Sequence, residues 1–154
     1  MGIINGYFLD QSTIVVDLKS TDKKSIITEL VDVLKNTKKL MKPDEILNAV
    51  LEREKLGSTG IGQGVAIPHG KTNVLDGHIG VLGISRNGVE FNSLDGELVH
   101  IIFILVGPAE VAEQHLKALS RISKLFRSKL LRENIIKAKT AEEVAEIIER
   151  EEAC

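Results

Sequence analysis

The chain has 154 residues, of which 43% are hydrophobic and 27% are charged. This length and balance predict a single globular domain, residues 1–154, whose core is large enough to fold without disulfide bonds. The formal net charge is −2 and only 3% of the residues are aromatic. These values argue against a nucleic-acid-binding protein, which needs a basic surface or rings that stack on bases.

The ends of the chain and its apolar runs indicate a soluble, cytoplasmic protein. The N-terminal residues lack the basic region and apolar core of a secretory signal. The longest largely apolar run, residues 98–106, is too short to span a bilayer, so we expect no stable membrane insertion. Cys154 is the single cysteine and the last residue, and we expect it to be solvated and unable to form an internal disulfide.

The first half of the chain predicts two helices between short strands. The β-branched run at residues 14–16 predicts a strand. Apolar residues at helical spacing predict a helix over residues 22–38. Pro43 and the two acidic residues after it open a second helix that runs to about Lys55. A further short strand is expected at residues 65–67, between a glycine and a proline.

The second half predicts two longer strands followed by three helices. Strands are expected at residues 79–85 and 98–106, with a turn at 86–88 after the first of them. The apolar run at 98–106 is typical of a central strand that is covered on both faces. The helices are expected at residues 110–126, 128–138 and 140–152, the last with a capping box formed by Thr140 and Glu143.

The interleaved strands and helices predict the fold class. We expect an α/β (α+β) protein: a single domain with a mixed β-sheet flanked by helices on both faces. No internal repeat, low-complexity tract or linker interrupts the chain.

A glycine-rich segment at residues 53–69, REKLGSTGIGQGVAIPH, is the most informative part of the sequence. Backbone amides that carry no Cβ can approach an anion closely. The segment leaves a helix and enters a strand, which is the reverse of a dinucleotide-binding loop, and it lacks the P-loop pattern. Its spacing leaves two interpretations open, an anion cradle or a loop whose glycines adopt positive φ.

His69 is the strongest candidate for a reactive group. It follows Pro68 at the end of the strand expected at 65–67, and α/β folds collect their site residues at such strand ends. An imidazole there can act as a nucleophile. By contrast, His78 and His100 lie at the starts of predicted strands and are expected to be surface or edge residues without a function.

His115 allows two interpretations. It shares the apolar stripe of its predicted helix with Ala112, Leu116 and Leu119, which is typical of a core histidine. It also lies in the early turns of a helix that follows the central strand, so its ring could share a site with His69. A metal site is not expected, because two histidines, with Glu113 as the only acidic residue at ligand spacing, are too few ligands and no zinc motif occurs. A serine hydrolase is not indicated either, because no Gly-x-Ser-x-Gly motif occurs.

These motifs resemble those of the fructose/mannitol-type (type 2) enzyme IIA domain of the phosphoenolpyruvate-dependent sugar phosphotransferase system. The resemblance covers about residues 13–148. It rests on Arg53-Glu54, Ser58-Thr59-Gly60-Ile61-Gly62, Gly64-Val65-Ala66-Ile67-Pro68-His69, Leu94-Asp95-Gly96, Gly107-Pro108 and His115-Leu116-Lys117-Ala118-Leu119.

The resemblance implies a phosphotransferase that works as a phosphocarrier without a cofactor. His69 would accept a phosphoryl group on Nε2 from the carrier protein HPr and pass it to a cysteine of enzyme IIB during sugar uptake. His115 and Arg53 match the family's second histidine and its arginine, and are expected to stabilise the phosphoryl group. Further donors are expected from Ser58, Thr59, Gly60, Gly62 and Gly64.

The resemblance also covers a second function. Members of the nitrogen-regulatory IIA branch are phosphoproteins that control partner proteins by their phosphorylation state. Both functions would use the same histidine, so the motif does not separate them.

Overall fold

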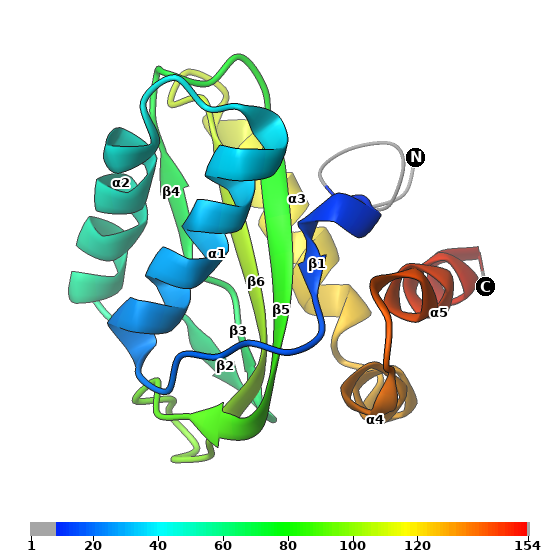
Figure 1. The fold of residues 1–154 in the computed structure, drawn as a ribbon. Coiled ribbons are helices and arrows are strands. Elements are labelled where there is room, and N and C mark those ends of the chain that lie inside the picture. Colours follow the sequence, from blue (N-terminus) through cyan, green and yellow to red (C-terminus); the bar gives the residue numbers. More distant parts are fainter. Residues whose placement is uncertain (1–8, 154) are drawn as a thin grey trace.

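The computed structural model describes residues 9–153, and Cys154 and the first eight residues lie outside this range. A mixed β-sheet forms the middle layer, with helices on both of its faces (Figure 1). The strands are β1 (Ile14–Val15), β2 (Gly60–Gly62), β3 (Val65–Ala66), β4 (His69–Lys71), β5 (Ile79–Val89) and β6 (Val99–Gly107). The helices are the short 3-10 helix η1 (Gln11–Thr13), α1 (Lys23–Lys38), α2 (Pro43–Lys55), α3 (Ala112–Leu125), α4 (Lys129–Lys137) and α5 (Ala141–Ala153).

The helices begin where the sequence provides a cap. The side chain of Asp22 accepts a hydrogen bond from the backbone N–H of Ser25 at the start of α1, and Pro43 occupies the first turn of α2. At α5, Thr140 Oγ1 accepts from the N–H of Glu143, whereas the Glu143 carboxylate accepts from the N–H of Lys139 rather than of Thr140. The five predicted α-helices are therefore confirmed, with small shifts at their ends.

The sheet is built around β6. Strand β5 pairs with it in antiparallel fashion on one side, and β3 and β4 pair with it in parallel fashion on the other, one after the other along its length. β1 extends the sheet beyond β5, and β2 pairs with β3. The predicted fold class, a mixed sheet flanked by helices, is confirmed.

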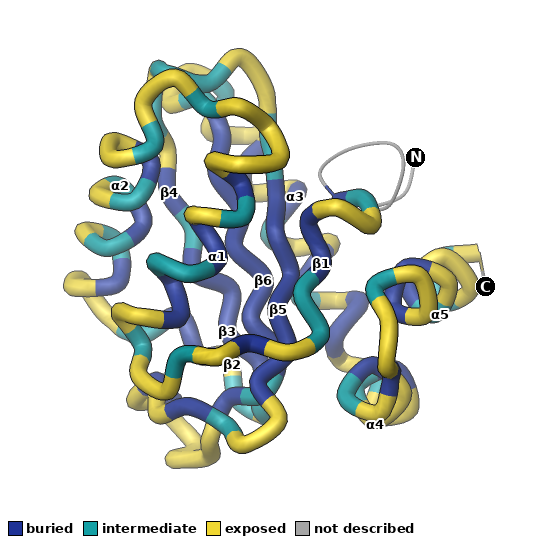
Figure 2. The backbone as a smooth tube through the Cα atoms, viewed as in Figure 1, coloured by how far each residue is buried: buried dark blue, intermediate teal, exposed yellow. Residues whose placement is uncertain are grey.

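Alternate residues of β6 belong to two separate hydrophobic cores. Ile101, Phe103 and Leu105 pack with residues of α3, α4 and α5. Their neighbours Ile102 and Ile104 pack with residues of α1 and α2. The strand is buried along almost its whole length (Figure 2), which confirms the prediction that it is central and covered on both faces.

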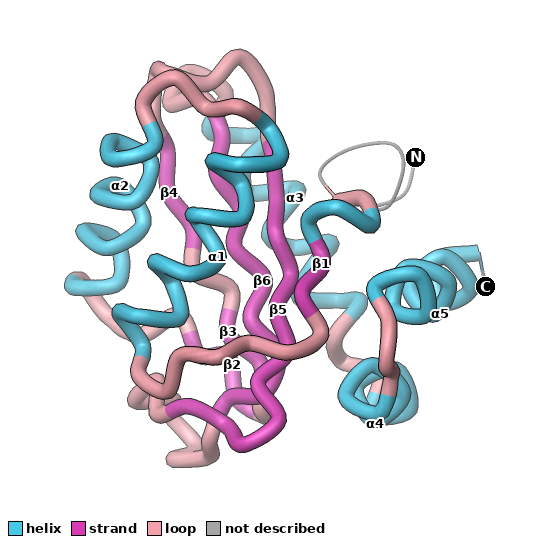
Figure 3. The backbone as a smooth tube through the Cα atoms, in the orientation of Figure 1, coloured by secondary structure: helices cyan, strands magenta, loops and turns pink. Residues whose placement is uncertain are grey.

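Four local predictions are wrong. Residues 60–62 form β2, which pairs with the expected strand β3 in a hairpin (Figure 3), rather than part of an open loop. His69 begins β4 rather than ending a strand. The turn expected at 86–88 is part of β5, which continues to Val89 through a shift in register. On α3 the buried face includes His115, Ala118 and Ile122, whereas Leu116 is exposed.

Within residues 9–153, none of the helices combines the length and the apolar character that crossing a membrane would require.

Candidate active site

His69 is held in one tautomer by its own backbone. Its Nδ1 lies 2.8 Å from the carbonyl oxygen of Ile67, and because a carbonyl only accepts, Nδ1 carries the proton and donates it. Pro68 lies between the two residues, and pairing of His69 with Leu105 of β6 fixes the backbone on its other side. The lone pair of the half-buried ring is therefore on Nε2, the nitrogen that can act as a nucleophile.

The ring of His69 also stays uncharged near neutral pH. Burial lowers its pKa below the ordinary value, and the positive charges of Arg53 and Lys71 lower it further. The hydrogen bond to Ile67 opposes this shift. A neutral ring is required for attack, because a protonated Nε2 would have no lone pair.

Three histidines from separate parts of the chain meet at this end of the sheet. The ring centroids of His69 and His115 are 5.6 Å apart, and those of His78 and His115 are 5.2 Å apart. His78 Nε2 lies 3.1 Å from His115 Nδ1. His115 is only 2% exposed, and its Nε2 has no hydrogen-bond partner among the residues that the structure describes. Both interpretations of His115 therefore apply: it is a buried residue, and its ring lies next to that of His69.

Burial lowers the pKa of His115 to about 4, and the neighbouring His69 and His78 add to the shift. His115 is therefore neutral at physiological pH, and its ring carries one N–H, which is a neutral donor. A neutral donor can bind a phosphoryl oxygen without introducing a charge into the buried cluster.

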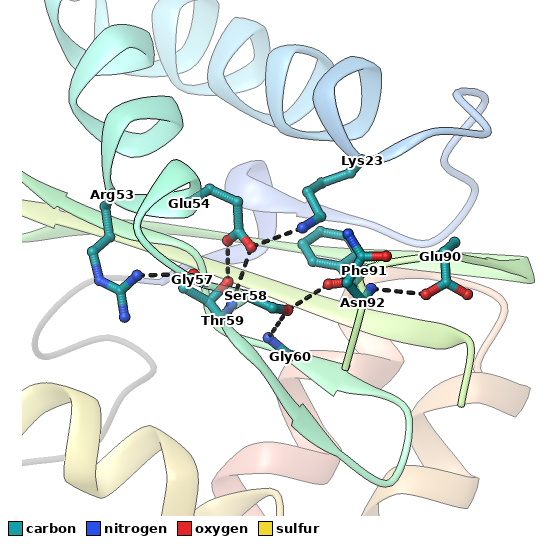
Figure 4. A network of polar contacts seen from close by, with 10 residues as sticks. All are labelled: Lys23, Arg53, Glu54, Gly57, Ser58, Thr59, Gly60, Glu90, Phe91 and Asn92. Carbon is teal, nitrogen blue, oxygen red and sulfur yellow. Dashed lines mark hydrogen bonds and ion pairs between the residues drawn. The ribbon is translucent and has the colours of Figure 1, made fainter. Parts of the chain in front are cut away.

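The end of α2 is tied to the segment after it by the polar contacts shown in Figure 4. Glu54 is buried, and its carboxylate accepts hydrogen bonds from Lys23 Nζ at 3.0 Å, from the backbone N–H of Thr59 at 3.0 Å and from Thr59 Oγ1. Arg53 Nη1 donates to the carbonyl of Gly57 at 2.9 Å. These bonds fix the start of the glycine-rich segment and hold the guanidinium where its charge acts on His69.

The residues expected to contact phosphate lie partly in the segment after α2 and partly in the β2–β3 hairpin. Ser58 Oγ donates to the carbonyl of Phe91 and accepts from the N–H of Gly60, so the hydroxyls of Ser58 and Thr59 both have partners within the fold. Gly64 lies opposite His100 on β6, whereas His69 pairs with Leu105. Five residues of strand separate these positions, which is roughly 16 Å.

The structure therefore does not bring the hairpin glycines to His69. Gly62 and Gly64 have φ of +92° and +81°, and Gln63 between them has φ of +57°. The carboxylate of Asp95 accepts from the N–H of Gln63 at 2.8 Å and closes this turn. The geometry supports the interpretation of a loop that needs positive φ for these two glycines.

Sequence reasoning missed two members of the site. The carbonyl of Ile67 fixes the tautomer of His69, and its position two residues before the histidine is a local signal that could have been used. His78 was expected to lack a function, but it contacts His115. No signal in the sequence connects these two histidines, because 37 positions separate them. No group of three or more His, Cys, Asp or Glu residues in the range 9–153 is arranged to hold a metal ion.

Strand β4 approaches α2 closely at Gly70, the residue after His69. A Cβ on Gly70 would lie 3.0 Å from backbone atoms of Ala49 and Val50 in α2. We expect Gly70→Ala to lower the free energy of unfolding by about 2 kcal/mol, because the helix must move away from the strand. Urea denaturation measures this change. Gly77→Ala is the control, since a Cβ there meets nothing within 4 Å, and equal stability of the two variants would contradict the prediction.

The low pKa of His115 makes stability depend on pH. In the unfolded chain the ring titrates near its ordinary pKa of 6.5, and in the folded protein near about 4. Between these two values the ring binds more protons in the unfolded state than in the folded state. The free energy of unfolding is therefore highest above about pH 6.5 and falls as the pH falls towards 4, by about 3 kcal/mol in total. Urea denaturation across this range should show the wild type losing stability more steeply than His115→Gln. Parallel curves would refute the prediction.

Comparison with known proteins identifies the family. The model of the family described as "Phosphoenolpyruvate-dependent sugar phosphotransferase system, EIIA 2" matches residues 7–151. The fructose-specific EIIABC component of the phosphotransferase system of Bacillus subtilis is 36% identical over 140 residues, which cover 91% of this chain and 22% of that protein. This chain thus spans about a fifth of the length of that relative.

Other relatives are nitrogen regulatory proteins. That of Escherichia coli is 34% identical over 122 residues, which cover 78% of this chain and 74% of that protein. The crystal structure of nitrogen regulatory protein IIA-Ntr from Neisseria meningitidis superposes with a TM-score of 0.82 at 36% identity, covering 90% of this chain and 94% of that one. The matching family model, these relatives and the shared fold show that the chain belongs to the type 2 enzyme IIA family of the phosphoenolpyruvate-dependent sugar phosphotransferase system.

Proposed function

We propose that the protein is a phosphocarrier that accepts a phosphoryl group from phospho-HPr on Nε2 of His69 and passes it to a cysteine of an enzyme IIB. The observation that carries this proposal is the bond from His69 Nδ1 to the carbonyl of Ile67, which leaves the Nε2 lone pair available. Membership of the enzyme IIA family supplies the class of reaction.

The proposed transfer needs no other reactive group. The Nε2 lone pair forms the new N–P bond while the bond between phosphorus and the donor histidine breaks, and that bond's electron pair returns to the donor ring. The Nδ1 proton stays on His69, and its bond to Ile67 stabilises the positive charge of the phosphorylated ring. Since the transition state for phosphoryl transfer is loose, the protein contributes mainly position and charge.

Arg53 and His115 are the groups that we propose for charge stabilisation. The guanidinium can turn its fork of donors to the phosphoryl oxygens, and its charge already acts on His69. His115 offers a buried ring nitrogen that lacks a partner in the described part of the chain. Ser58, Thr59 and Gly60 support Arg53 by fixing the segment that follows α2, and any direct contact with phosphate would first require their present hydrogen bonds to open.

Two exposed leucines favour docking of protein partners near the site. Leu116, next to His115, is 67% exposed, and Leu56, which follows α2, is 84% exposed. Single exposed leucines are common on protein surfaces, but a partner that transfers a phosphoryl group to or from His69 must cover the surface around this ring. We propose that HPr and enzyme IIB contact these two leucines in turn when they do so.

Regulation is the second candidate function. The similarity to the IIA-Ntr structure, which covers 94% of that chain, favours a phosphoprotein that binds its targets according to the state of His69. The similarity to a fructose-specific component at the same 36% identity favours transport.

One experiment tests the phosphocarrier and then separates the two roles. The protein is incubated with phosphoenolpyruvate, enzyme I and HPr, and tandem mass spectrometry locates the phosphoryl group. We expect one group, on the peptide that contains His69. A second step adds an enzyme IIB, and transfer to its cysteine supports transport, whereas a phosphoryl group that stays on His69 with every IIB of the organism supports regulation. Phosphorylation at any other residue would overturn the proposal.

A further inference from the structure

His78 has no role in the phosphoryl transfer proposed for His69, Arg53 and His115. It lies immediately before β5, and its half-buried ring points its Nε2 at His115 Nδ1, 3.1 Å away. The ring also packs so closely on Gly107 of β6 that a Cβ there would overlap it. Packing against β6 therefore restricts the ring of His78 to this position.

The contact between the two rings is a hydrogen bond only if one of the two facing nitrogens, His78 Nε2 or His115 Nδ1, carries a proton. A hydrogen bond needs a donor and an acceptor, so the proton is either on His78 Nε2 or on His115 Nδ1. In the first arrangement His115 carries its own proton on Nε2, and in the second its Nε2 carries a lone pair. Burial lowers the pKa of both rings, which keeps them neutral and excludes a charged pair at neutral pH.

The buried Nε2 of His115 distinguishes the two arrangements. This atom has no partner among residues 9–153, and its ring lies beside the ring of His69. A phosphoryl group on His69 brings oxygen atoms that only accept hydrogen bonds. An N–H at His115 Nε2 would gain its missing acceptor from that group, whereas a lone pair there would repel it and remain unsatisfied.

We propose that His78 is a positioning residue that donates its Nε2–H to His115 Nδ1, holding His115 in the tautomer whose Nε2–H binds the phosphoryl group on His69. The inference rests on the proposed phosphocarrier function. It assigns to His78 the part that the carbonyl of Ile67 has for His69, namely to fix which ring nitrogen carries the proton. Removing the partner that orients a metal-binding histidine typically costs about ten-fold or more in activity, and we expect an effect of similar size for His115.

Two variants separate the hydrogen bond from the bulk of the ring. His78→Leu removes the donor and keeps an apolar side chain, and His78→Gln keeps an N–H group close to the place of Nε2. We expect His78→Leu to accept phosphoryl groups from phospho-HPr about ten-fold more slowly than the wild type, and His78→Gln to recover most of the rate. Urea denaturation of both variants gives the stability for comparison, because a purely structural effect would follow stability rather than the presence of the donor.

The tautomers themselves are measured by long-range proton–nitrogen NMR on the unphosphorylated protein. We expect His115 to carry its proton on Nε2 in the wild type and in His78→Gln, and to show a mixture of both tautomers in His78→Leu. A wild-type His115 protonated on Nδ1 would overturn the proposal, and so would equal rates for His78→Leu and His78→Gln. Because the NMR measurement involves no phosphoryl transfer, it tests His78 even if the phosphocarrier function fails.

Discussion

Replacing His69 by alanine is expected to abolish phosphoryl acceptance from phospho-HPr. The Nε2 lone pair of this ring is the proposed nucleophile, and the bond from Nδ1 to Ile67 places it there. Neither neighbouring histidine is expected to replace it, since His115 is buried and the Nε2 of His78 is in contact with Nδ1 of His115. Intact-mass spectrometry after incubation with phosphoenolpyruvate, enzyme I and HPr should show no added phosphoryl group.

His100→Ala is the matched control for this variant. His100 also lies in the sheet and donates from Nδ1 to a backbone carbonyl, that of Ser85, at 2.9 Å. It differs from His69 in its place, at the other end of β6. We expect His100→Ala to be phosphorylated to the same extent as the wild type. A phosphoryl group on His69→Ala, or its loss from His100→Ala with the fold intact, would refute the assignment of the site.

Replacing Glu54 by alanine is expected to lower the free energy of unfolding by about 4 kcal/mol, because three hydrogen-bond donors lose a buried acceptor. The side chain of Glu54 is 5% exposed and accepts from Lys23 and from both donors of Thr59 (Figure 4). The ammonium of Lys23, which also lies over the ring of Phe91, would lose this anionic partner. Urea denaturation at neutral pH measures the loss.

Glu52→Ala is the control in the same helix. Glu52 also pairs with a lysine, Lys55 at 3.0 Å, but its side chain is 70% exposed. Exposed pairs of this kind contribute about 0.5 kcal/mol, so the control should be nearly as stable as the wild type. If the two variants lose the same stability, the buried network does not stabilise the end of α2. We also expect Glu54→Ala to accept phosphoryl groups more slowly, because the segment from Gly57 to Thr59, to which Arg53 is bonded, would lose its anchor.

Helices and the central strand were predictable from the sequence because their signals are local. The helix at 43–55 matches α2 at both ends, since Pro43 and Gly57 act on the backbone next to them. The strand expected at 98–106 matches β6 within one residue, because its apolar run reflects burial on both faces. The caps formed by Asp22 and Thr140 are local as well, because each side chain accepts from a backbone N–H three residues further along the chain.

The short strands and the end of β5 could not be predicted in this way. β2 and β4 have three residues each, with glycine among them, and they are strands only because of the segments that pair with them, β3 for β2 and β6 for β4. Arg86-Asn87-Gly88 has the composition of a turn, but pairing of Val89 with Val99 keeps the segment in the sheet. Hydrogen bonds to distant strands outweighed local preference in both cases.

The sequence by itself determined the fold class through its interleaved strand and helix patterns, and it indicated the family and the candidate nucleophile through the motifs that include Pro68-His69. Tertiary structure decided what surrounds that histidine. The β2–β3 hairpin carries Gly62 and Gly64 to the far end of β6, and the pairing of β4 with β6, the start of β5 and α3 bring His69, His78 and His115 together. The reason is physical: a motif of consecutive residues fixes its own backbone, whereas contacts between side chains 37 positions apart depend on how the whole sheet is paired.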